Sequence, residues 1–226
     1  PILFEIPACG ERMNMGGGKK TTFGIRYPNQ SMKVHRSSIM EKHQITIEKS
    51  ELRIDGERLF LRVLKVSDVT QEYVDWLNDE EVNQFLEIRF SHQTKESVRE
   101  YVEKNFQDAN IVMFAIILSD SQKHIGNVKL SINWHHKQAE IGIMIGDKNS
   151  WGRGYAAEVI TILSRYAFEG LKLHKLTAGA YEQNIGSIKA FLKAGFFEEC
   201  RLTKHMFFKD RYVDKVLLGK MHEEYK

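Results

Sequence analysis

The 226 residues of this chain suffice for one well-buried domain with an appendage, or for two very small domains. Its composition, 42% hydrophobic and 28% charged, is that of a globular protein and excludes a disordered or fibrous one. The formal charge of +3 arises from basic residues interspersed with acidic ones. We therefore expect no dedicated nucleic-acid surface, whereas an anionic small ligand remains compatible.

The first fifty residues differ from the rest of the chain. The stretch from Cys9 to Gln30 shows no sustained apolar period, so we expect residues 1–50 to form a partly disordered or loosely packed extension. Its Gly-Lys-Lys-Thr resembles a phosphate-binding loop. However, Lys20 stands where that loop needs Ser or Thr, and no strand precedes it, which favours a flexible tail.

From about Glu57 the pattern becomes regular, and we expect one domain over residues 57–222. Residues 59–64 are typical of a strand, and Ser67 and Asp68 offer an N-cap for a helix through residues 73–77. A second helix is predicted to start near Thr94. Its apolar residues follow the i, i+3, i+4, i+8 spacing of an amphipathic helix: Val98, Tyr101, Val102 and Phe106.

Three strands are predicted next, at residues 111–118, 124–134 and 139–145, with a hairpin turn at 119–123. After a glycine turn come a long helix through residue 168, a strand at 176–181 and a helix at 184–193 that ends at Gly195. Two antiparallel strands around a turn at 209–211 complete the chain. This order predicts an α+β fold, an α/β sandwich with a single parallel crossover near the glycine turn.

The glycine turn, Trp151-Gly152-Arg153-Gly154-Tyr155-Ala156, lies between a strand and a helix. A helix N-terminus offers free N–H donors and partial positive charge, and glycines let the backbone approach phosphate oxygens, so the turn suits a phosphate. Residues 152–157, Gly-Arg-Gly-Tyr-Ala-Ala, also match the dinucleotide-binding pattern GxGxxA. That pattern normally follows the first strand of an all-parallel series, whereas this turn follows antiparallel strands. A βα loop without a ligand is the remaining alternative.

With these features, residues 57 to 222 resemble the GCN5-related N-acetyltransferase (GNAT) superfamily, in particular its RimJ/RimL-like branch. The family's pyrophosphate motif, Gln/Arg-x-x-Gly-x-Gly/Ala, corresponds to residues 151–156, with Trp151 in place of Gln or Arg. Its second motif, Asn-x-x-Ser/Ala followed by Gly-Phe, corresponds to Asn184, Ser187 and Gly195-Phe196. The extension before residue 50 lies outside the resemblance.

The resemblance implies a mixed, mostly antiparallel central sheet, flanked by helices and splayed at a β-bulge in the strand before the glycine turn. The cleft would receive acetyl-CoA, with its pantetheine amides paired to the backbone of Met144 and Ile145. The other residues implied for cofactor binding are Trp151, Gly152, Arg153, Gly154, Tyr155, Ala156, Asn184 and Ser187. A backbone N–H would hold the oxyanion, and acetyl would move directly to a primary amine in a ternary complex.

The attacking amine must be neutral, which calls for a base. Glu140 is the first candidate, because family members carry a basic Glu on the corresponding strand, although an exposed strand residue is the alternative. Glu87 lies in the segment where the family binds the acceptor and could be the base or an amine-recognising carboxylate. The family's usual thiolate donor, a Tyr, is replaced by Phe191, which leaves Ser187 as the donor or as a locally satisfied helix hydroxyl. We find no ligand spacing for a metal site.

The acceptor is the least determined part of the site. Residues 76–90 resemble the helix–loop segment of acyltransferases from surface-polysaccharide pathways, which implies an amino sugar on a nucleotide carrier, with an Arg suited to its diphosphate. A polyamine or a protein N-terminus, as in ribosomal-protein acetyltransferases, is the alternative. A non-catalytic CoA-binding module is the alternative from another class, and a homodimer is compatible with all of these functions.

Two cysteines, Cys9 and Cys200, show neither CxxC spacing nor a disulfide framework, which fits a reducing cytoplasm. No apolar run reaches the roughly 18 residues of a membrane span, and the beginning of the chain lacks the layout of a signal peptide. We therefore expect a cytoplasmic enzyme.

Overall fold

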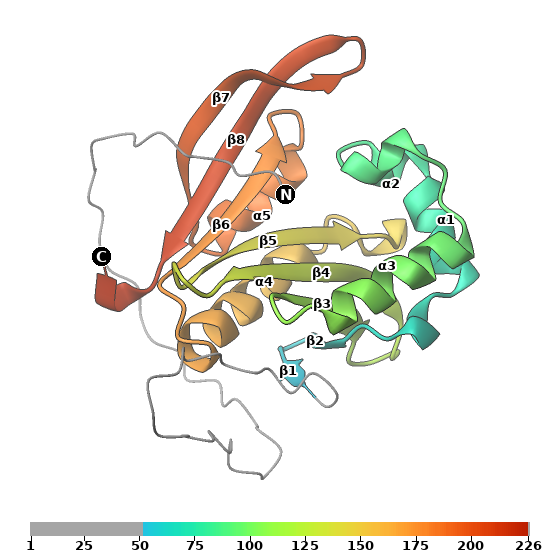
Figure 1. The fold of residues 1–226 in the computed structure, drawn as a ribbon, viewed down its shortest axis with the longest axis horizontal. Coiled ribbons are helices and arrows are strands. Elements are labelled where there is room, and N and C mark those ends of the chain that lie inside the picture. The colour runs from blue at the N-terminus through green and yellow to red at the C-terminus, as the bar shows by residue number, and fades with distance from the viewer. Residues whose placement is uncertain (1–51, 226) are drawn as a thin grey trace.

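The computed structural model describes residues 52–225. They form an eight-stranded mixed sheet in the order β1-β2-β3-β4-β5-β6-β8-β7 (Figure 1). The strands are β1 (Arg53–Asp55), β2 (Leu59–Val63), β3 (Ile111–Leu118), β4 (His124–Asn133), β5 (Gln138–Ile145), β6 (Lys175–Tyr181), β7 (Phe197–Phe208) and β8 (Arg211–Met221). The helices are α1 (Gln71–Asn78), α2 (Glu80–Asn83), α3 (Lys95–Gln107), α4 (Tyr155–Arg165) and α5 (Ile185–Lys193). The predicted α+β plan is confirmed.

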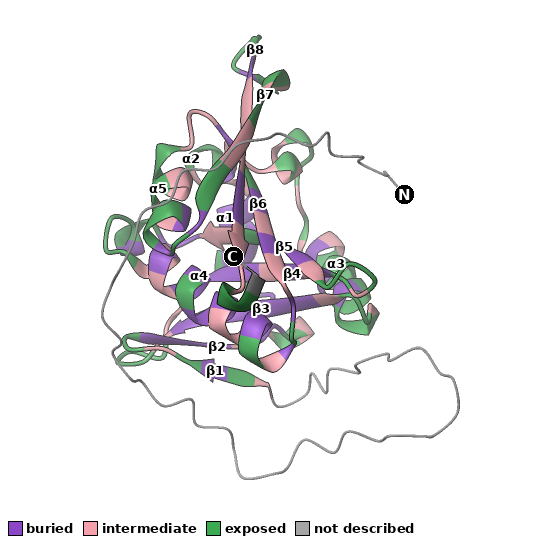
Figure 2. Cartoon of the chain, turned by 90° about the vertical axis from the view of Figure 1, so that its left-hand side faces the viewer, coloured by how far each residue is buried: buried purple, intermediate pink, exposed green. Residues whose placement is uncertain are grey.

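Two layers of helices cover the sheet, and each has its own apolar core (Figures 1 and 2). Strand β3 shows why both faces are buried: Phe114 and Ile116 face the layer of α4 and α5, whereas Met113 and Ala115 face α1 and α3. A strand buried on both faces reads as a continuous apolar run, as residues 111–118 do. Each such large side chain stabilises the fold by about 1.5–3 kcal/mol.

Strands β5 and β6 are the only parallel neighbours among the described strands, and they soon separate. Their pairing consists of Gln138↔Lys175, Ala139↔Leu176 and Glu140↔Thr177, after which the two strands diverge. On its other side, β5 stays paired with β4 in unbroken register up to Ile145. The expected splay is therefore present, and it leaves one side of β5 without a neighbouring strand.

The bulge expected in this strand lies just beyond its end. Gly146 and Asp147 both donate their backbone N–H to the carbonyl of Ile125, at 2.9 and 3.1 Å. Two consecutive donors on one carbonyl form the hydrogen-bond pattern of a β-bulge. The bulge turns the chain away from the sheet after Ile145 and leads it toward the glycine turn.

The first helix begins later than predicted. Thr70, and not Ser67 or Asp68, is its N-cap: the Thr70 hydroxyl accepts the N–H of Tyr73 at 3.2 Å. Asp68 is engaged elsewhere, because its carboxylate accepts two hydrogen bonds from Arg62, each 2.7 Å long. A carboxylate held by a charged partner is not available to cap the helix, and the sequence pattern does not show that Arg62, six residues earlier, is that partner.

Two further differences concern the edges of the predicted elements. Strand β1 pairs with β2 and lies before residue 57, so the sheet begins earlier than expected. In α3 the buried residues are Val98, Val102 and Asn105, whereas Tyr101 and Phe106 are exposed by 41% and 40%. The predicted apolar face was therefore too wide. The extension at residues 1–50 lies outside the described residues.

The long hairpin of β7 and β8 projects beyond the body of the sheet (Figure 1). Its turn residues Lys209 and Asp210 both have positive φ, 47° and 62°, as a two-residue turn of type I′ requires. The hairpin brings Phe207 and Phe208 close to the segment after α2. Two distant parts of the chain thus meet where the cleft between β5 and β6 opens.

Candidate active site

The glycine turn has the backbone conformation that phosphate binding needs. Gly152 has φ of 72°, and Gly154, the N-cap of α4, has φ of 79°. A side chain at either position would strain the backbone, because L-residues avoid this region. Before the turn, the Asp147 carboxylate accepts the hydroxyl of Ser150 at 2.8 Å. The first N–H groups of α4 therefore face outward from a preformed turn.

Two cations from distant segments converge on Gly154. A Cβ placed on this glycine would lie 3.8 Å from Nη2 of Arg58 and 4.0 Å from Nζ of Lys193. Arg58 is held there by Glu158 at 2.8 Å and donates to the carbonyl of Arg153 at 2.9 Å. Sequence reasoning missed both residues, since one precedes β2 and the other ends α5. Together with Arg153 they place positive charge around the turn.

The backbone N–H and C=O groups at the end of β5 point alternately toward β4 and toward the gap that β6 leaves. Gly146 donates its N–H to Ile125 on β4, and Met144, two residues earlier, points to the same strand, where it pairs with Asn127. Hydrogen-bonding direction alternates along an antiparallel strand, and Ile143 and Ile145 therefore face the side that β6 leaves. The indole of Trp151 donates to the carbonyl of Ile145 at 2.8 Å. The groups open to a ligand are thus those of Ile143 and the N–H of Ile145, and not those of Met144.

The second motif forms the start of α5. The side chain of Asn184 caps this helix by accepting the N–H of Ser187 at 3.2 Å. The hydroxyl of Ser187 is half-buried and has no hydrogen-bond partner within residues 52–225. Phe191, at the position where the family carries a Tyr, is 2% exposed and packs edge-on against Phe196. Gly195 has φ of 86°, as the predicted C-cap requires.

Glu140 lies at the point where β5 and β6 separate. It occupies the last parallel pair, opposite Thr177, and is exposed. Successive side chains of β5 alternate between faces, so Glu140 shares a face with Gly142 and Met144, away from α4 and α5. A Cβ on Gly142 would meet nothing within 4 Å. Glu140 therefore faces open space beside the point where β5 and β6 separate.

Glu87 belongs to a short helical turn, η2 (Glu87–Phe90), that contacts the end of β6. Its Oε1 accepts the hydroxyl of Tyr181 at 2.7 Å, and Arg89 donates to the same hydroxyl at 2.9 Å. Arg89 also donates to the carbonyls of Leu86 and Phe207. Burial and the hydrogen bond to Glu87 raise the pKa of Tyr181. Arg89 was expected to suit a diphosphate, whereas Tyr181 was not predicted, because only the fold brings it to Glu87 and Arg89.

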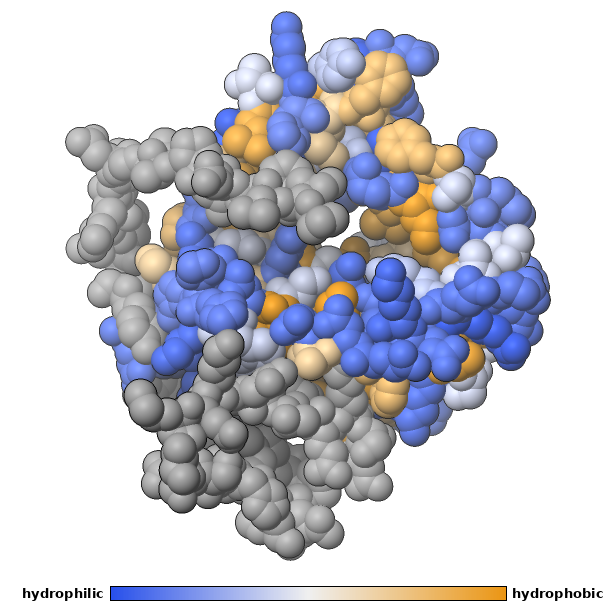
Figure 3. Space-filling model, in the orientation of Figure 1, coloured by the Kyte–Doolittle hydropathy of each residue, from blue (hydrophilic) through white to orange (hydrophobic). Residues whose placement is uncertain are grey.

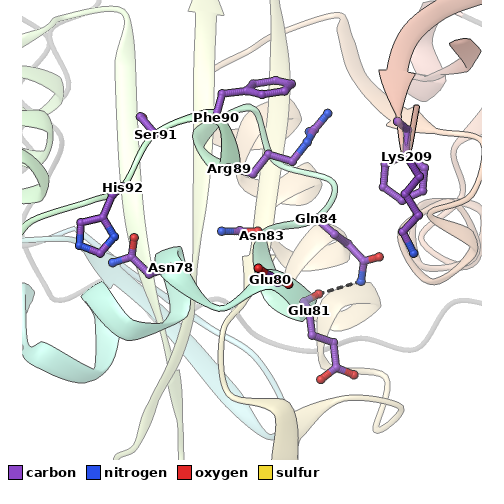
Figure 4. A pocket seen from close by; sticks show the side chains of 11 residues that line it. Asn78, Glu80, Glu81, Asn83, Gln84, Arg89, Phe90, Ser91, His92 and Lys209 are labelled. Atoms are coloured by element: carbon purple, nitrogen blue, oxygen red, sulfur yellow. Dashed lines mark hydrogen bonds between the residues drawn. The ribbon is translucent and has the colours of Figure 1, made fainter. Parts of the chain in front are cut away.

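A pocket of about 860 Å³ adjoins this network (Figure 4). Figure 3 shows the same face hollowed between the β7–β8 hairpin and the α1–α2 region, with apolar side chains on its walls. The pocket is lined by Asn78, Glu80, Glu81, Asn83, Gln84, Arg89, Phe90, Ser91, His92, Phe208 and Lys209. Neither Glu140 nor Ser187 lines it, so the pocket is separate from the gap between β5 and β6.

Other features bear on the expected chemistry. Within residues 52–225 no group of three His, Cys, Asp or Glu side chains is placed to hold a metal ion. The adjacent His135 and His136 are exposed in the turn between β4 and β5. No helix in this part of the chain is both long and apolar enough to cross a membrane. The cytoplasmic location and the homodimer stay predictions.

Comparisons with known proteins identify the family of this chain. Residues 58–197 match the family model of the acetyltransferase (GNAT) domain. Among curated proteins, the probable N-acetyltransferase YjcK of Bacillus subtilis is 30% identical over 174 residues, 74% of this chain and 95% of that protein. The spermidine N(1)-acetyltransferase of Vibrio cholerae is 28% identical over 161 residues, 70% of this chain and 90% of that protein.

Solved structures share the fold. The Vibrio cholerae spermidine N-acetyltransferase in complex with CoA and spermine superposes with a TM-score of 0.66 at 25% identity, over 74% of this chain and 98% of that one. A GNAT-family acetyltransferase from Bacillus anthracis gives a TM-score of 0.66 at 23% identity, over 75% and 98%. From its glycine turn, its splayed strands and these matches, the chain belongs to the GNAT acetyltransferase family and is an acyltransferase that uses acetyl-CoA as donor.

Proposed function

We propose that this enzyme acetylates a primary amine of a small aliphatic polyamine, by direct transfer from acetyl-CoA in a ternary complex. The observation that carries the choice of acceptor is the engagement of Arg89. This is the arginine that would have suited the diphosphate of a nucleotide-linked sugar. Its guanidinium already donates to Leu86, Phe207 and Tyr181.

The carboxylates of the acceptor side support a cationic substrate. Glu87 and Glu140 are exposed, and Glu80 forms no ion pair with any residue of the described chain. Carboxylates that face open space favour an ammonium group and disfavour an anionic carrier. The spermidine acetyltransferase of Vibrio cholerae, found both among the curated proteins and among the solved structures, is a relative whose name specifies a polyamine acceptor. A ribosomal-protein-S5-alanine acetyltransferase from Vibrio fischeri is only 18% identical and shares the fold alone, so the protein N-terminus, like the amino sugar, stays a prediction.

On the donor side, the pyrophosphate would bind to the turn 151–156, where Arg58 and Lys193 add positive charge. The pantetheine amides would pair with the open backbone groups of Ile143 and Ile145, as an added strand pairs with a free edge. Asn184 keeps its capping role and shapes the turn that holds Ser187. This arrangement aims the thioester at the mouth of the cleft, between β5 and β6.

In the transfer, a neutral amine nitrogen attacks the thioester carbon. A C–N bond forms, the C–S bond breaks, and the attacking nitrogen gives up one N–H proton to water. Counted from the ammonium form of the amine, the products are the amide, CoA thiol and one released proton. Glu87 binds the amine, and Glu140, about 13 Å back along the strands, accepts the proton that frees the amine through a relay of waters. The Ser187 hydroxyl protonates the departing thiolate and is reprotonated from water. The N–H of Ile145 is the donor nearest the expected oxyanion.

An amine panel tests the acceptor. Thiol release from acetyl-CoA is measured with spermidine, spermine, a nucleoside-diphosphate-linked amino sugar and a short peptide with a free N-terminus. We expect the two polyamines to exceed the others at least tenfold in kcat/KM. Faster turnover of the amino sugar or the peptide would overturn the proposal. Tight acetyl-CoA binding without transfer to any amine would instead favour the non-catalytic module.

A further inference from the structure

Resting on this proposed function, we infer that Tyr181 is a positioning residue for the reaction. Its hydroxyl holds the carboxylate of Glu87 at the mouth of the cleft, where the amine must enter. Tyr181 does not touch the reacting atoms, and it acts through Glu87. The inference rests on strand register, on the direction of two hydrogen bonds and on a contrast in burial.

Register places Tyr181 at the level of the thioester. The last parallel pair joins Glu140 to Thr177, and both Met144 and Tyr181 follow their pair by four residues. At about 3.3 Å per residue, each lies about 13 Å farther along its strand. The two residues therefore stand at the same height on opposite sides of the opening. Tyr181 shares the open face with Glu140, because parallel partners point to the same side.

The direction of the hydrogen bonds is determined by chemistry. Arg89 can only donate, so the Tyr181 oxygen accepts the bond of 2.9 Å from its Nη2. The single proton of the hydroxyl is then free to go to Glu87 Oε1 at 2.7 Å, a length typical of a charge-assisted bond. Because burial and Glu87 raise the pKa of Tyr181, the hydroxyl remains a donor at neutral pH.

Tyr181 and Glu87 differ in how far their side chains are exposed to solvent. Tyr181 is 4% exposed and packs against Phe85 and Phe208, whose rings lie 5.8 and 5.9 Å from its own. The Glu87 side chain is 68% exposed. Its second oxygen, Oε2, has no partner within residues 52–225. A fixed carboxylate with one open oxygen is suited to receive an ammonium or amine N–H.

Arg89 completes the arrangement by joining the acceptor segment to the hairpin. Its Nη2 also donates to the carbonyl of Phe207 at 3.0 Å, and its Nη1 donates to that of Leu86. The segment that carries Glu87 is thereby tied to β7 as well as to β6. Tyr181 is the one member of the network that bonds Glu87 by a short, directed hydrogen bond, since Arg89 and Glu87 are 3.8 Å apart.

The test compares Tyr181→Phe, Glu87→Gln and the double variant, using whichever amine of the panel the wild-type enzyme acetylates fastest. A failure of the polyamine proposal then changes the substrate and not this test. We expect Tyr181→Phe to raise the KM for the amine about tenfold, while the KM for acetyl-CoA stays within twofold. The double variant should be no worse than Glu87→Gln alone, because both single changes remove the same contact.

The control is Tyr212→Phe, which removes a hydroxyl from an exposed residue at the tip of the hairpin. It should leave both KM values unchanged. An unchanged amine KM in Tyr181→Phe would overturn the inference, and so would losses that multiply in the double variant. A lower Tm together with a rise in both KM values would also overturn it, since that result indicates a structural role only.

Discussion

The two halves of the active site are built in different ways. The donor half consists of backbone: two glycines with positive φ, the first turn of α4 and the free side of β5. The acceptor half proposed here consists of side chains from three distant segments, at Glu87, Tyr181 and Phe208. A cofactor common to a whole family can be bound by backbone, whereas the choice of amine depends on side chains. The difference explains why the donor could be predicted and the acceptor could not.

The largest effect is expected when a side chain is placed in the glycine turn, because the donor half is built from backbone. Gly154→Val puts a branched residue where φ is 79° and where a ligand would approach the backbone. We expect the KM for acetyl-CoA to rise at least a hundredfold, while the amine KM changes little. Initial rates with each substrate varied in turn measure both constants. An acetyl-CoA KM within threefold of wild type would contradict a backbone-built donor site.

The next largest effects are expected at the two proposed proton carriers. Ser187→Ala and Glu140→Gln should each lower kcat by about 10²-fold, the usual contribution of a positioned acid or base. Binding of acetyl-CoA, followed by calorimetry, should stay within twofold. Full rates in both variants across the pH range would remove these residues from the mechanism and would return Ser187 to a local helix role.

Removing a cation beside the turn should raise the KM for acetyl-CoA less than changing the backbone of the turn does. Lys193→Gln is expected to raise the KM for acetyl-CoA three- to tenfold, since an exposed charge acts through screened electrostatics. The effect should shrink in 1 M salt. Lys104→Gln on α3 is the matched control, with the same loss of charge away from the turn. An equal rise in the KM for acetyl-CoA in both variants would mean that the net charge of the protein, and not the position of Lys193, affects cofactor binding.

The smallest effect on activity is expected from a substitution of Asp68, whose carboxylate is bonded to Arg62. Burial alone would raise the pKa of this carboxyl, but hydrogen bonds from Arg62 and from the N–H of Lys65 outweigh burial and lower the pKa. A group whose pKa is lowered in the folded state stabilises above its unfolded value and loses that effect as the pH falls. Asp68→Asn should therefore cost about 1–2 kcal/mol at pH 7 and progressively less below pH ~4.

Thermal unfolding at several pH values checks this last prediction, and kcat at pH 7 should change less than twofold. Glu100→Gln, on the exposed face of α3, is the control and should leave Tm unchanged. An Asp68→Asn protein whose loss of stability is the same at pH 3 and pH 7 would show that the carboxyl contributes packing and not charge.

Much of the fold and the donor site follows from the sequence alone, because the signals are local. Apolar periodicity indicated each long helix and strand, and the spacing of Gly152, Gly154, Asn184 and Gly195 indicated the turn and the cap. The helix over residues 95–107 shows the limit of such signals. Its periodicity was correct, but which apolar residues are covered depended on neighbours that the helix does not contain.

Tertiary structure alone decided the rest. Only the alternating hydrogen bonds of β5 indicate that Ile143 faces the gap and Met144 does not. Only the folding of residues 86–90 against the end of β6 brings Tyr181 to Glu87 and Arg89, and only the hairpin adds the carbonyl of Phe207. Backbone conformation is encoded by the residue that adopts it, and so a glycine turn can be recognised in a sequence. A side-chain network across 94 residues is encoded by the packing of the whole sheet, and so the acceptor site appears only when the chain is folded.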